Sequence, residues 1–327
     1  MAQLGEFELI ARYFTRPVRR AALGVGDDCA LFAVAPGMTL AVSSDMLVEG
    51  RHFVSTVSPE RLGHKALAVN LRDLAACGAR PLAFTLALAL PSADEAFLAP
   101  FARGLLALAD RHDCELVGGD TTRGPLTIAI TVFGEVATGA ALLRSGARPG
   151  DDVYVSGTLG DARLALEVLR GTIAVDGAAF ARVRRAMEEP QPRVGLGLAL
   201  AGIATSAIDV SDGLNGDLGH VLDRSGVAAV VDVDALPRSA DLASQAVALQ
   251  RECLLAGGDD YELVFTASVE CRGAVAEAAA AAATTVTRVG RIESGRGLRF
   301  VDGAGRGIDG PASSFDHFRA AAAPAST

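Results

Sequence analysis

Lysine is almost missing from this sequence. Lys65 is the only lysine in 327 residues, and Ala66 follows it. A Walker A phosphate-binding loop needs a Lys followed by Ser or Thr, so the sequence contains none. It also lacks the combination of a G-x-G-x-x-G loop and a strand lysine that a protein-kinase site requires. Any phosphate chemistry in this chain must therefore rest on metal ions, arginines and backbone N–H groups.

Cysteine pairs and long apolar runs are also missing. The five cysteines are scattered without a C-x-x-C pair, which argues against a zinc site or a disulfide framework and favours reduced, buried thiols. No apolar run reaches the length of about 18 residues that spans a bilayer without a charge, Gly or Pro. The N-terminus has neither the basic start nor the apolar stretch of a signal peptide. We expect a cytoplasmic protein that contacts no membrane.

Positive charge is in deficit. The chain has 39 acidic and 30 basic side chains, and its formal net charge is −9. Binding to duplex nucleic acid needs a basic face, so we expect no nucleic-acid partner. An acidic chain can still bind an anionic substrate where bound cations invert the local charge. The length of 327 residues fits two domains better than one.

The apolar periodicity predicts helices and strands without the regular βαβ spacing of a Rossmann sheet. We therefore expect an α+β protein of two mixed α/β domains. The Gly- and Pro-bearing loop at residues 144–150 is the predicted boundary, with domains at residues 1–145 and 150–320. Predicted helices cover residues 4–14, 59–77, 95–112 (after a capping box at Ser92 and Glu95), 161–169, 178–187, 194–204, 214–222 and 274–283. Predicted strands cover residues 39–44, 83–90, 115–117, 126–136, 152–156, 206–210, 228–233, 261–267, 286–292 and 298–302.

Aspartate recurs beside Gly or Ser, mostly at the ends of apolar runs. Each group has an ordinary structural explanation: an Asx turn at Asp27 and Asp28, a helix cap at Asp45, or a satisfied polar pair at Asn70 and Asp73. Several such groups together, in a chain without a Walker lysine, favour a site where several magnesium ions hold a nucleotide triphosphate. Arg123 and Arg144 are candidates for binding its phosphates. The groups lie at residues 26–28, 43–45, 70–73, 118–120, 209–212 and 257–260.

Six motifs, in order and spread over almost the whole chain, resemble those of bacterial thiamine-monophosphate kinases. They are GEFELI at 5–10, GDDCA at 26–30, KALAVNLRDLAA at 65–76, GGDTTRG at 118–124, DVSDGL at 209–214 and GGDDYEL at 257–263. The resemblance implies ATP-dependent phosphorylation of thiamine monophosphate to thiamine diphosphate. It also implies an N-terminal domain that binds ATP and magnesium and forms a homodimer through its strands, a C-terminal α+β domain, and an active cleft between the two.

The resemblance implies roles for individual residues, with none as a covalent nucleophile. His52, Asp259 and Phe315 would contact thiamine monophosphate, although the family more often has Glu at the second position and Tyr or Trp at the third. ATP would contact Gly119, Asp120, Arg144 and Ser211. The magnesium ligands would be Asp28, Ser43, Ser44, Asp45, Asp73, Asp120, Asp209 and Asp212.

A phosphate acceptor is already largely ionised at neutral pH, so it needs charge screening more than a strong base. We therefore expect direct in-line transfer assisted by several magnesium ions. A competing hypothesis is another enzyme of the same fold group, an aminoimidazole-ribonucleotide or selenophosphate synthetase. The latter would carry a reactive Cys in a Gly-rich N-terminal segment, and this sequence has none. Two further hypotheses are a non-catalytic nucleotide-binding protein and a purely structural oligomer, of which the oligomer leaves so many Asp-Gly turns unexplained.

Overall fold

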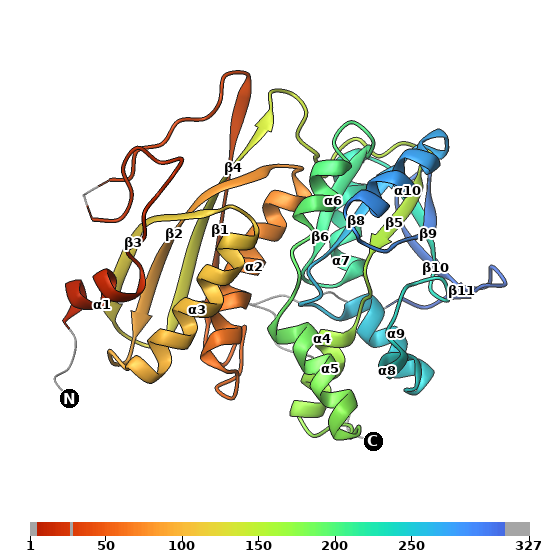
Figure 1. The fold of residues 1–327 in the computed structure, drawn as a ribbon. Coiled ribbons are helices and arrows are strands. Elements are labelled where there is room, and N and C mark those ends of the chain that lie inside the picture. The colour runs from red at the N-terminus through yellow and green to blue at the C-terminus, as the bar shows by residue number, and fades with distance from the viewer. Residues whose placement is uncertain (1–4, 27–28, 311–327) are drawn as a thin grey trace.

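A computed structural model describes residues 5–26 and 29–310, which form two halves with one sheet each (Figure 1). The first sheet has the order β1-β4-β2-β3 and the second has the order β11-β10-β7-β9-β5-β8-β6. The expected α+β class is confirmed. The first half contains α1 (Glu6–Tyr13), β1 (Met38–Val48), α2 (Pro59–Ala76), β2 (Arg80–Leu90), α3 (Glu95–Arg111), β3 (Glu115–Arg123) and β4 (Thr127–Ala137).

The second half alternates strands with helices around its mixed sheet. The three neighbouring strands β5, β8 and β6, which end the sheet order, are buried along their whole length. The strands are β5 (Asp152–Ser156), β6 (Ser206–Val210), β7 (Ala228–Asp232), β8 (Glu262–Ala267), β9 (Val286–Glu293), β10 (Gly297–Val301) and β11 (Gly307–Ile308). The helices are α4 (Asp161–Leu169), α5 (Gly177–Glu188), α6 (Val194–Ala199), α7 (Leu214–Ser225), α8 (Ala240–Ala243), α9 (Val247–Ala256) and α10 (Arg272–Ala281), with a 3₁₀ turn at Val269–Cys271.

Helix α2 lies at the boundary between the two halves (Figure 1), which we call the seam. It begins at Pro59 after the N-cap Ser58, whose hydroxyl accepts the N–H of Arg61, and it is buried over most of its length. On one side it packs on α3, β1 and β4, and on the other it contacts α6 and β6. Its side chains therefore reach strands of both sheets.

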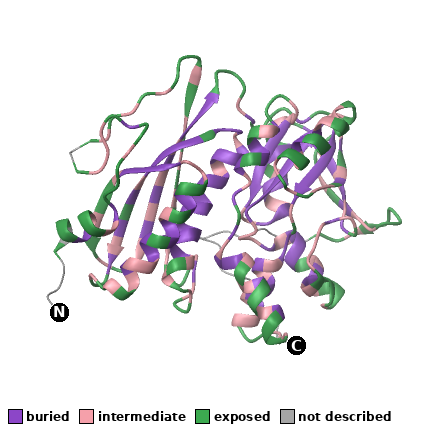
Figure 2. Ribbon diagram, viewed as in Figure 1, coloured by how far each residue is buried: buried purple, intermediate pink, exposed green. Residues whose placement is uncertain are grey.

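The four-stranded sheet is covered by helices on one face only. Along β4, Ile128, Ile130 and Val132 are buried beneath α2 and α3, whereas the residues between them are partly exposed (Figure 2). The opposite face, which we call the outer face, carries Val42 (54% exposed) and Met46 (56% exposed) of β1. Among the described helices, none combines the length and the apolar sequence that crossing a membrane requires.

Several sequence predictions are wrong in detail. Asp45 was expected to close a buried strand, but β1 continues to Val48 and is exposed on its outer face. The sequence 118–120 was expected to follow a short strand, but it lies inside β3. The N-cap of α3 is Asp94, which accepts the N–H of Ala96, instead of Ser92. The short helices α8 and α9 were not predicted, because their apolar residues do not follow a clear helical period.

Helices α2 and α3 approach so closely that each contributes a glycine to the contact. A Cβ added to Gly63 would lie 2.1 Å from the Phe101 carbonyl oxygen, and one added to Gly104 would lie 1.9 Å from the Glu60 carbonyl oxygen. Both obstacles are backbone atoms, so the helices would have to separate. The position of α2 at the seam thus depends on the absence of two side chains.

We predict that Gly63→Ala lowers the free energy of unfolding by about 1–3 kcal/mol, because overpacking forces the two helices apart. Chemical denaturation of the purified variant measures this. The control is Gly219→Ala in α7, where an added Cβ meets nothing within 4 Å. It should be neutral or stabilising by up to about 1 kcal/mol, since Ala is the better helix former. Equal effects of the two substitutions would contradict the close-approach explanation.

Candidate active site

A cavity of about 790 Å³ opens at the seam. Residues at the end of β1, in the loop after it and along α2 line one wall. Residues of α4, after β6 and before β8 line the other. The lining includes Asp45, Arg51, His52, Arg72, Arg163, Arg170, Ser211, Asp212, Gly258, Asp259 and Tyr261. The cavity therefore collects five of the predicted site residues, namely Asp45, His52, Ser211, Asp212 and Asp259.

Three carboxylates surround the guanidinium of Arg72, which lines this cavity together with one of them, Asp45. Arg72 Nη1 lies 2.9 Å from Asp209 Oδ2, Nη2 donates to Asp45 Oδ2 at 3.2 Å, and Nε lies 3.6 Å from Asp73 Oδ1. We call Asp45, Asp73 and Asp209 the carboxylate cluster. It draws one residue from β1, one from α2 and one from β6, so it joins the two halves. The sequence analysis did not identify Arg72, because only the fold shows which charges surround it.

Two further contacts hold Arg72 on the side away from the cluster. Its Nε donates to the Val69 carbonyl oxygen at 2.7 Å, and its guanidinium carbon lies 4.5 Å from the centre of the Tyr261 ring. Burial by itself would lower the pKa of Arg72, but the surrounding negative charge, that of Asp209 above all, raises it above its ordinary value. The guanidinium therefore stays charged.

Asp73 is the member of the cluster whose ionised form is disfavoured by its surroundings. Burial, together with the negative charges of Asp209 and Asp45, raises its pKa to about 6, against the opposing effect of Arg72. Ser43 Oγ donates to Asp73 Oδ2 at 2.5 Å. Asn70, the other half of the pair seen in the sequence, has a structural role: its Oδ1 accepts the Asp45 N–H at 3.0 Å and its Nδ2 donates to Ala66.

On the other wall, Asp217 holds the loop that carries Ser211 and Asp212. Its Oδ2 accepts the N–H groups of these two residues at 2.9 and 3.0 Å. Burial and the nearby charge of Asp209 raise the pKa of Asp217 to about 7. The sequence analysis missed this residue, although an acidic side chain in the first turn of a helix was a visible signal.

His52 and Asp259, the expected substrate contacts, are linked through the single lysine. Lys65 Nζ donates to Asp259 Oδ2 at 2.8 Å and to the His52 carbonyl oxygen at 3.1 Å, and Lys65 itself is buried. Although burial would raise the pKa of Asp259, the charge of Lys65 holds it below its usual value. The Tyr261 hydroxyl donates to the other carboxylate oxygen, and the His52 ring accepts the Val48 N–H through Nδ1.

The sheet register separates Asp120 from the carboxylate cluster. Asp45 lies opposite Ile130 of β4. Ile130 lies opposite Leu86 of β2, which in turn lies opposite Gly119 of β3. Since neighbouring side chains of a strand point to opposite faces, Asp120 belongs to the outer face, whereas Asp45 points toward α2. Gly119 has φ +151°, and a Cβ there would lie 1.8 Å from the Leu86 carbonyl oxygen.

The remaining predicted site residues are also outside the cluster. Ser44 belongs to the outer face and hydrogen-bonds with Thr131 Oγ1 at 3.0 Å. Arg123 and Arg144 are exposed. Asp28 and Phe315 lie outside the described residues.

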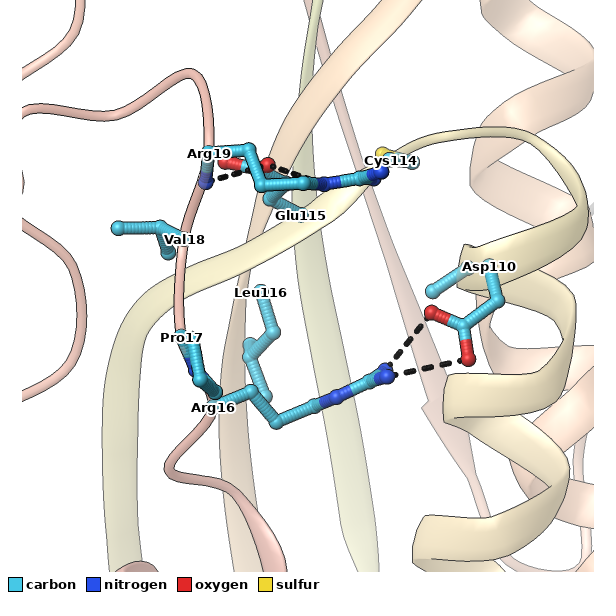
Figure 3. A pocket seen from close by; sticks show the side chains of 9 residues that line it. Arg16, Pro17, Val18, Arg19, Asp110, Cys114, Glu115 and Leu116 are labelled. Atoms are coloured by element: carbon cyan, nitrogen blue, oxygen red, sulfur yellow. Dashed lines mark hydrogen bonds and ion pairs between the residues drawn. The ribbon is translucent and has the colours of Figure 1, made fainter.

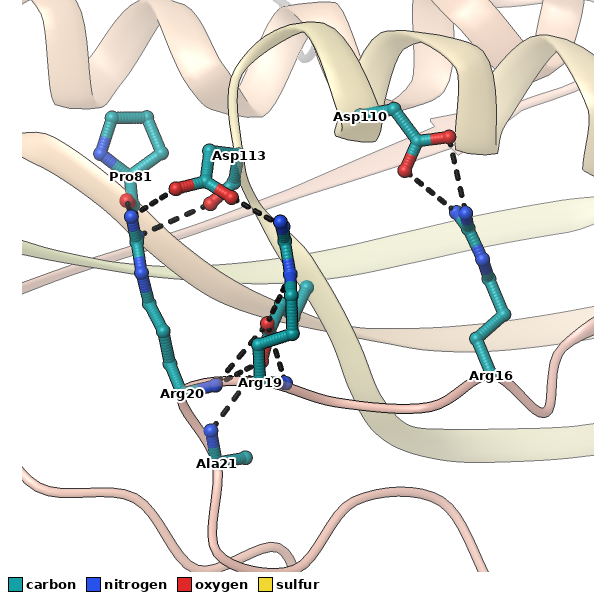
Figure 4. Close-up of polar contacts among 8 residues, drawn as sticks. Arg16, Arg19, Arg20, Ala21, Pro81, Asp110 and Asp113 are labelled. Carbon is teal, nitrogen blue, oxygen red and sulfur yellow. Dashed lines mark hydrogen bonds and ion pairs between the residues drawn. The ribbon is translucent and has the colours of Figure 1, made fainter.

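A second, smaller cavity of about 340 Å³ lies where residues 16–19 run beside β3, the edge strand of the first sheet. Its charged groups are paired: Arg16 with Asp110, and Arg19 with Asp113 (Figure 3 and Figure 4). The Glu115 carboxylate accepts the backbone N–H groups of residues 19–21. These contacts fasten the N-terminal segment to the sheet, and both arginines among the described lining residues are already paired with carboxylates.

Comparison with protein families gives two matches, both to AIR synthase related proteins. The N-terminal domain of that family matches residues 26–136, and its C-terminal domain matches residues 148–303. The second match includes the whole of the second sheet except β11, and the first includes every strand of the first sheet up to Val136.

Individual relatives share most of their length with this chain. The thiamine-monophosphate kinase of Salmonella typhimurium is 46% identical over 96% of this chain and 98% of its own, and that of Bacillus subtilis is 33% identical over 88% and 91%. The crystal structure of thiamine-monophosphate kinase from Stenotrophomonas maltophilia K279a has a TM-score of 0.83 and 45% identity, covering 92% of this chain and 95% of its own. AaThiL complexed with AMPPCP and TMP has a TM-score of 0.73 and 30% identity, with coverage of 84% and 88%.

We predict an unusual pH dependence of stability from Asp217. Its folded-state pKa of about 7 lies above the ordinary 3.8, so the stability it contributes is complete below about pH 3.8 and is lost as the pH rises through 7. Asp217→Asn keeps an acceptor oxygen and never ionises. Between pH 4 and 7, the metal-free wild type should therefore lose stability relative to this variant in chemical denaturation.

Asp152→Asn is the control, because hydrogen bonding from Arg272 holds the pKa of buried Asp152 below 3.8. Its effect should stay constant over the same pH range. A constant difference between wild type and Asp217→Asn would show that Asp217 does not titrate there.

Proposed function

The chain belongs to the thiamine-monophosphate kinases of the AIR synthase related family, and from this premise we propose that its carboxylate cluster binds magnesium for direct phosphoryl transfer between two bound substrates. It is a phosphotransferase that uses ATP to convert thiamine monophosphate to thiamine diphosphate. The complex of AaThiL with AMPPCP and TMP supports both substrates. These relatives favour a kinase over the two synthetases.

The observation that carries the proposal is the position of the cluster, at a cavity wall where the two halves meet. Magnesium prefers oxygen ligands, and Asp45, Asp73 and Asp209 with the Ser43 hydroxyl supply them. Asp209 is buried, and its Oδ2, although 2.9 Å from Arg72 Nη1, makes no hydrogen bond within the described residues, so it can still accept a contact from a metal ion. As the side chains stand, no described group of three or more His, Cys, Asp or Glu side chains is placed to hold a metal ion, and Arg72 lies among these carboxylates. The donor chemistry nevertheless fits the ion.

The remaining magnesium ligands are proposed from the resemblance to the family. We include Asp212, which lies at the same cavity, Ser44 and Asp120 from the outer face, and Asp28. For ATP we propose contacts with Gly119, Arg144 and Ser211. For thiamine monophosphate we propose His52, Asp259 and Phe315. The cytoplasmic location stays a prediction from the sequence.

The chain's own residues bind and orient the two substrates. Magnesium bound at the cluster would neutralise negative charge on the triphosphate, on the acceptor phosphate and on the leaving ADP. Arg51, Arg163 and Arg170 also line the cavity, and the last two are paired with Glu167. Lys65 fixes the Asp259 carboxylate, and the Val48 N–H fixes the His52 ring, so both are oriented before the substrate arrives. The acceptor oxygen attacks directly, and a phosphorylated protein trapped in a single turnover would contradict this.

We also propose that the outer face is the surface of a homodimer. Leu40 (41% exposed), Val42 and Met46 form an apolar row on β1, at the edge of a sheet whose other face is already buried. Such a row on an uncovered sheet face is typical of an interaction surface. The resemblance implies dimerisation through the strands of this domain. Ser44 shares this face, so the proposed interface would lie close to proposed ligands.

We predict that the wild type forms ADP and thiamine diphosphate in equal amounts from ATP, magnesium and thiamine monophosphate. Asp45→Asn and Asp120→Asn should each lower kcat/KM about a hundredfold or more, because each removes a charge that orients a metal ion. Chromatography of both products measures this. The control is Asp110→Asn, which should keep full activity, because Asp110 pairs with Arg16 at an edge distant from the cluster. ATP turnover without a thiamine product would instead assign a different acceptor.

We predict that Val42→Asp combined with Met46→Asp converts the dimer to a monomer, because two charges would be buried at the interface. Light scattering after size-exclusion chromatography gives the mass. Val247→Asp is the control, since Val247 is 60% exposed on the second half, and it should leave the dimer intact. A monomeric wild type at micromolar concentration would rule out the proposed interface.

A further inference from the structure

Arg72 already carries positive charge in the place where the proposed function needs a metal ion. In the described part of the chain it is the only basic side chain that forms an ion pair with any member of the carboxylate cluster. Arg72 is 9% exposed and Asp209 is 5% exposed. Close charges in such a buried setting interact strongly, so the guanidinium has a large effect on what else the carboxylates can bind.

Two of the three contacts that Arg72 makes with the cluster balance charge without forming a hydrogen bond. Nη1 and Asp209 Oδ2 lie 2.9 Å apart, yet neither atom makes a hydrogen bond within the described residues. The Nε–Asp73 contact, at 3.6 Å, is also an ion pair only. One guanidinium leaves two of the three negative charges uncompensated. The carboxylates can therefore gain by turning toward a divalent cation.

The guanidinium has supports that do not involve the cluster. Nε donates to Val69 O at 2.7 Å, and the ring of Tyr261 lies 4.5 Å from its central carbon. These contacts do not depend on the orientation of any carboxylate. Arg72 can thus stay in place, charged, while the carboxylates rotate away from it.

We propose that Arg72 is a built-in counter-cation that holds the carboxylate cluster together before magnesium binds and then competes with magnesium for it. This rests on the proposed magnesium-binding function of the cluster and adds the residue that sets its metal affinity. Arg72 is a positioning residue. Without it, three like charges at the seam would repel one another, so the metal-free protein would be less stable. With it, each metal ion must displace a guanidinium contact and approach a like charge.

The test compares wild type and Arg72→Gln by calorimetric titration with Mg²⁺ alone and by thermal unfolding at a series of Mg²⁺ concentrations. Without metal, the variant should unfold at a lower temperature. Its Kd for Mg²⁺ should be about tenfold lower than that of the wild type, and magnesium should raise its unfolding temperature more. If Arg72→Gln is too unstable without metal, Arg72→Lys keeps the charge, and its Kd should stay near the wild-type value.

Arg193→Gln is the matched control, because Arg193 forms a largely buried ion pair with Glu262, which is not a proposed ligand. It should lower the unfolding temperature without changing the Kd for Mg²⁺. An unchanged or higher Kd for Mg²⁺ in Arg72→Gln would overturn the inference. The proposed function would still stand if the wild type makes thiamine diphosphate. The inference would also be overturned if neither the wild type nor Arg72→Gln released heat on titration with Mg²⁺. If the wild type also made no thiamine diphosphate, the proposed function would be rejected.

Discussion

The repulsion among three carboxylates that meet at the seam, one of them buried, is the constraint on which the rest of the structure depends. Asp45, Asp73 and Asp209 come from different elements and would separate if no cation lay between them. Because Asp209 belongs to the second half, the same interaction that neutralises the cluster also holds the halves in register. Neutralising the carboxylates and joining the two halves therefore depend on the same contacts.

Helix α2 supplies most of the side chains that make these contacts. It supplies Asp73 to the cluster, Arg72 to balance it, Asn70 to fix the backbone of β1, and Lys65 to orient Asp259 across the seam. It can do so because Gly63 and Gly104 let it pack closely on α3 while its other side faces β6. The side chains that balance charge are thus held on a rigid element that is buried on both sides.

The sequence alone predicted most helices and strands, because apolar periodicity, Pro and Gly are local signals. It also predicted that Asp45, Asp73 and Asp209 belong to one site, although it did so from the recurrence of Asp beside Gly and Ser. It could not predict that Asp45 lies inside a strand or that Asp120 faces the other side of the sheet, since both depend on register between strands far apart in sequence. Arg72 and Asp217 were missed for a similar reason: their importance comes from neighbours that only the folded chain provides.

A crystal structure with Mn²⁺ and a non-hydrolysable ATP analogue tests the central claim most directly, because anomalous scattering locates the metal independently of the protein. The account predicts metal peaks within bonding distance of the Asp45, Asp73 and Asp209 carboxylates, with Arg72 still beside Tyr261. Metal bound only to the nucleotide phosphates, with all three carboxylates still paired to Arg72, would contradict it.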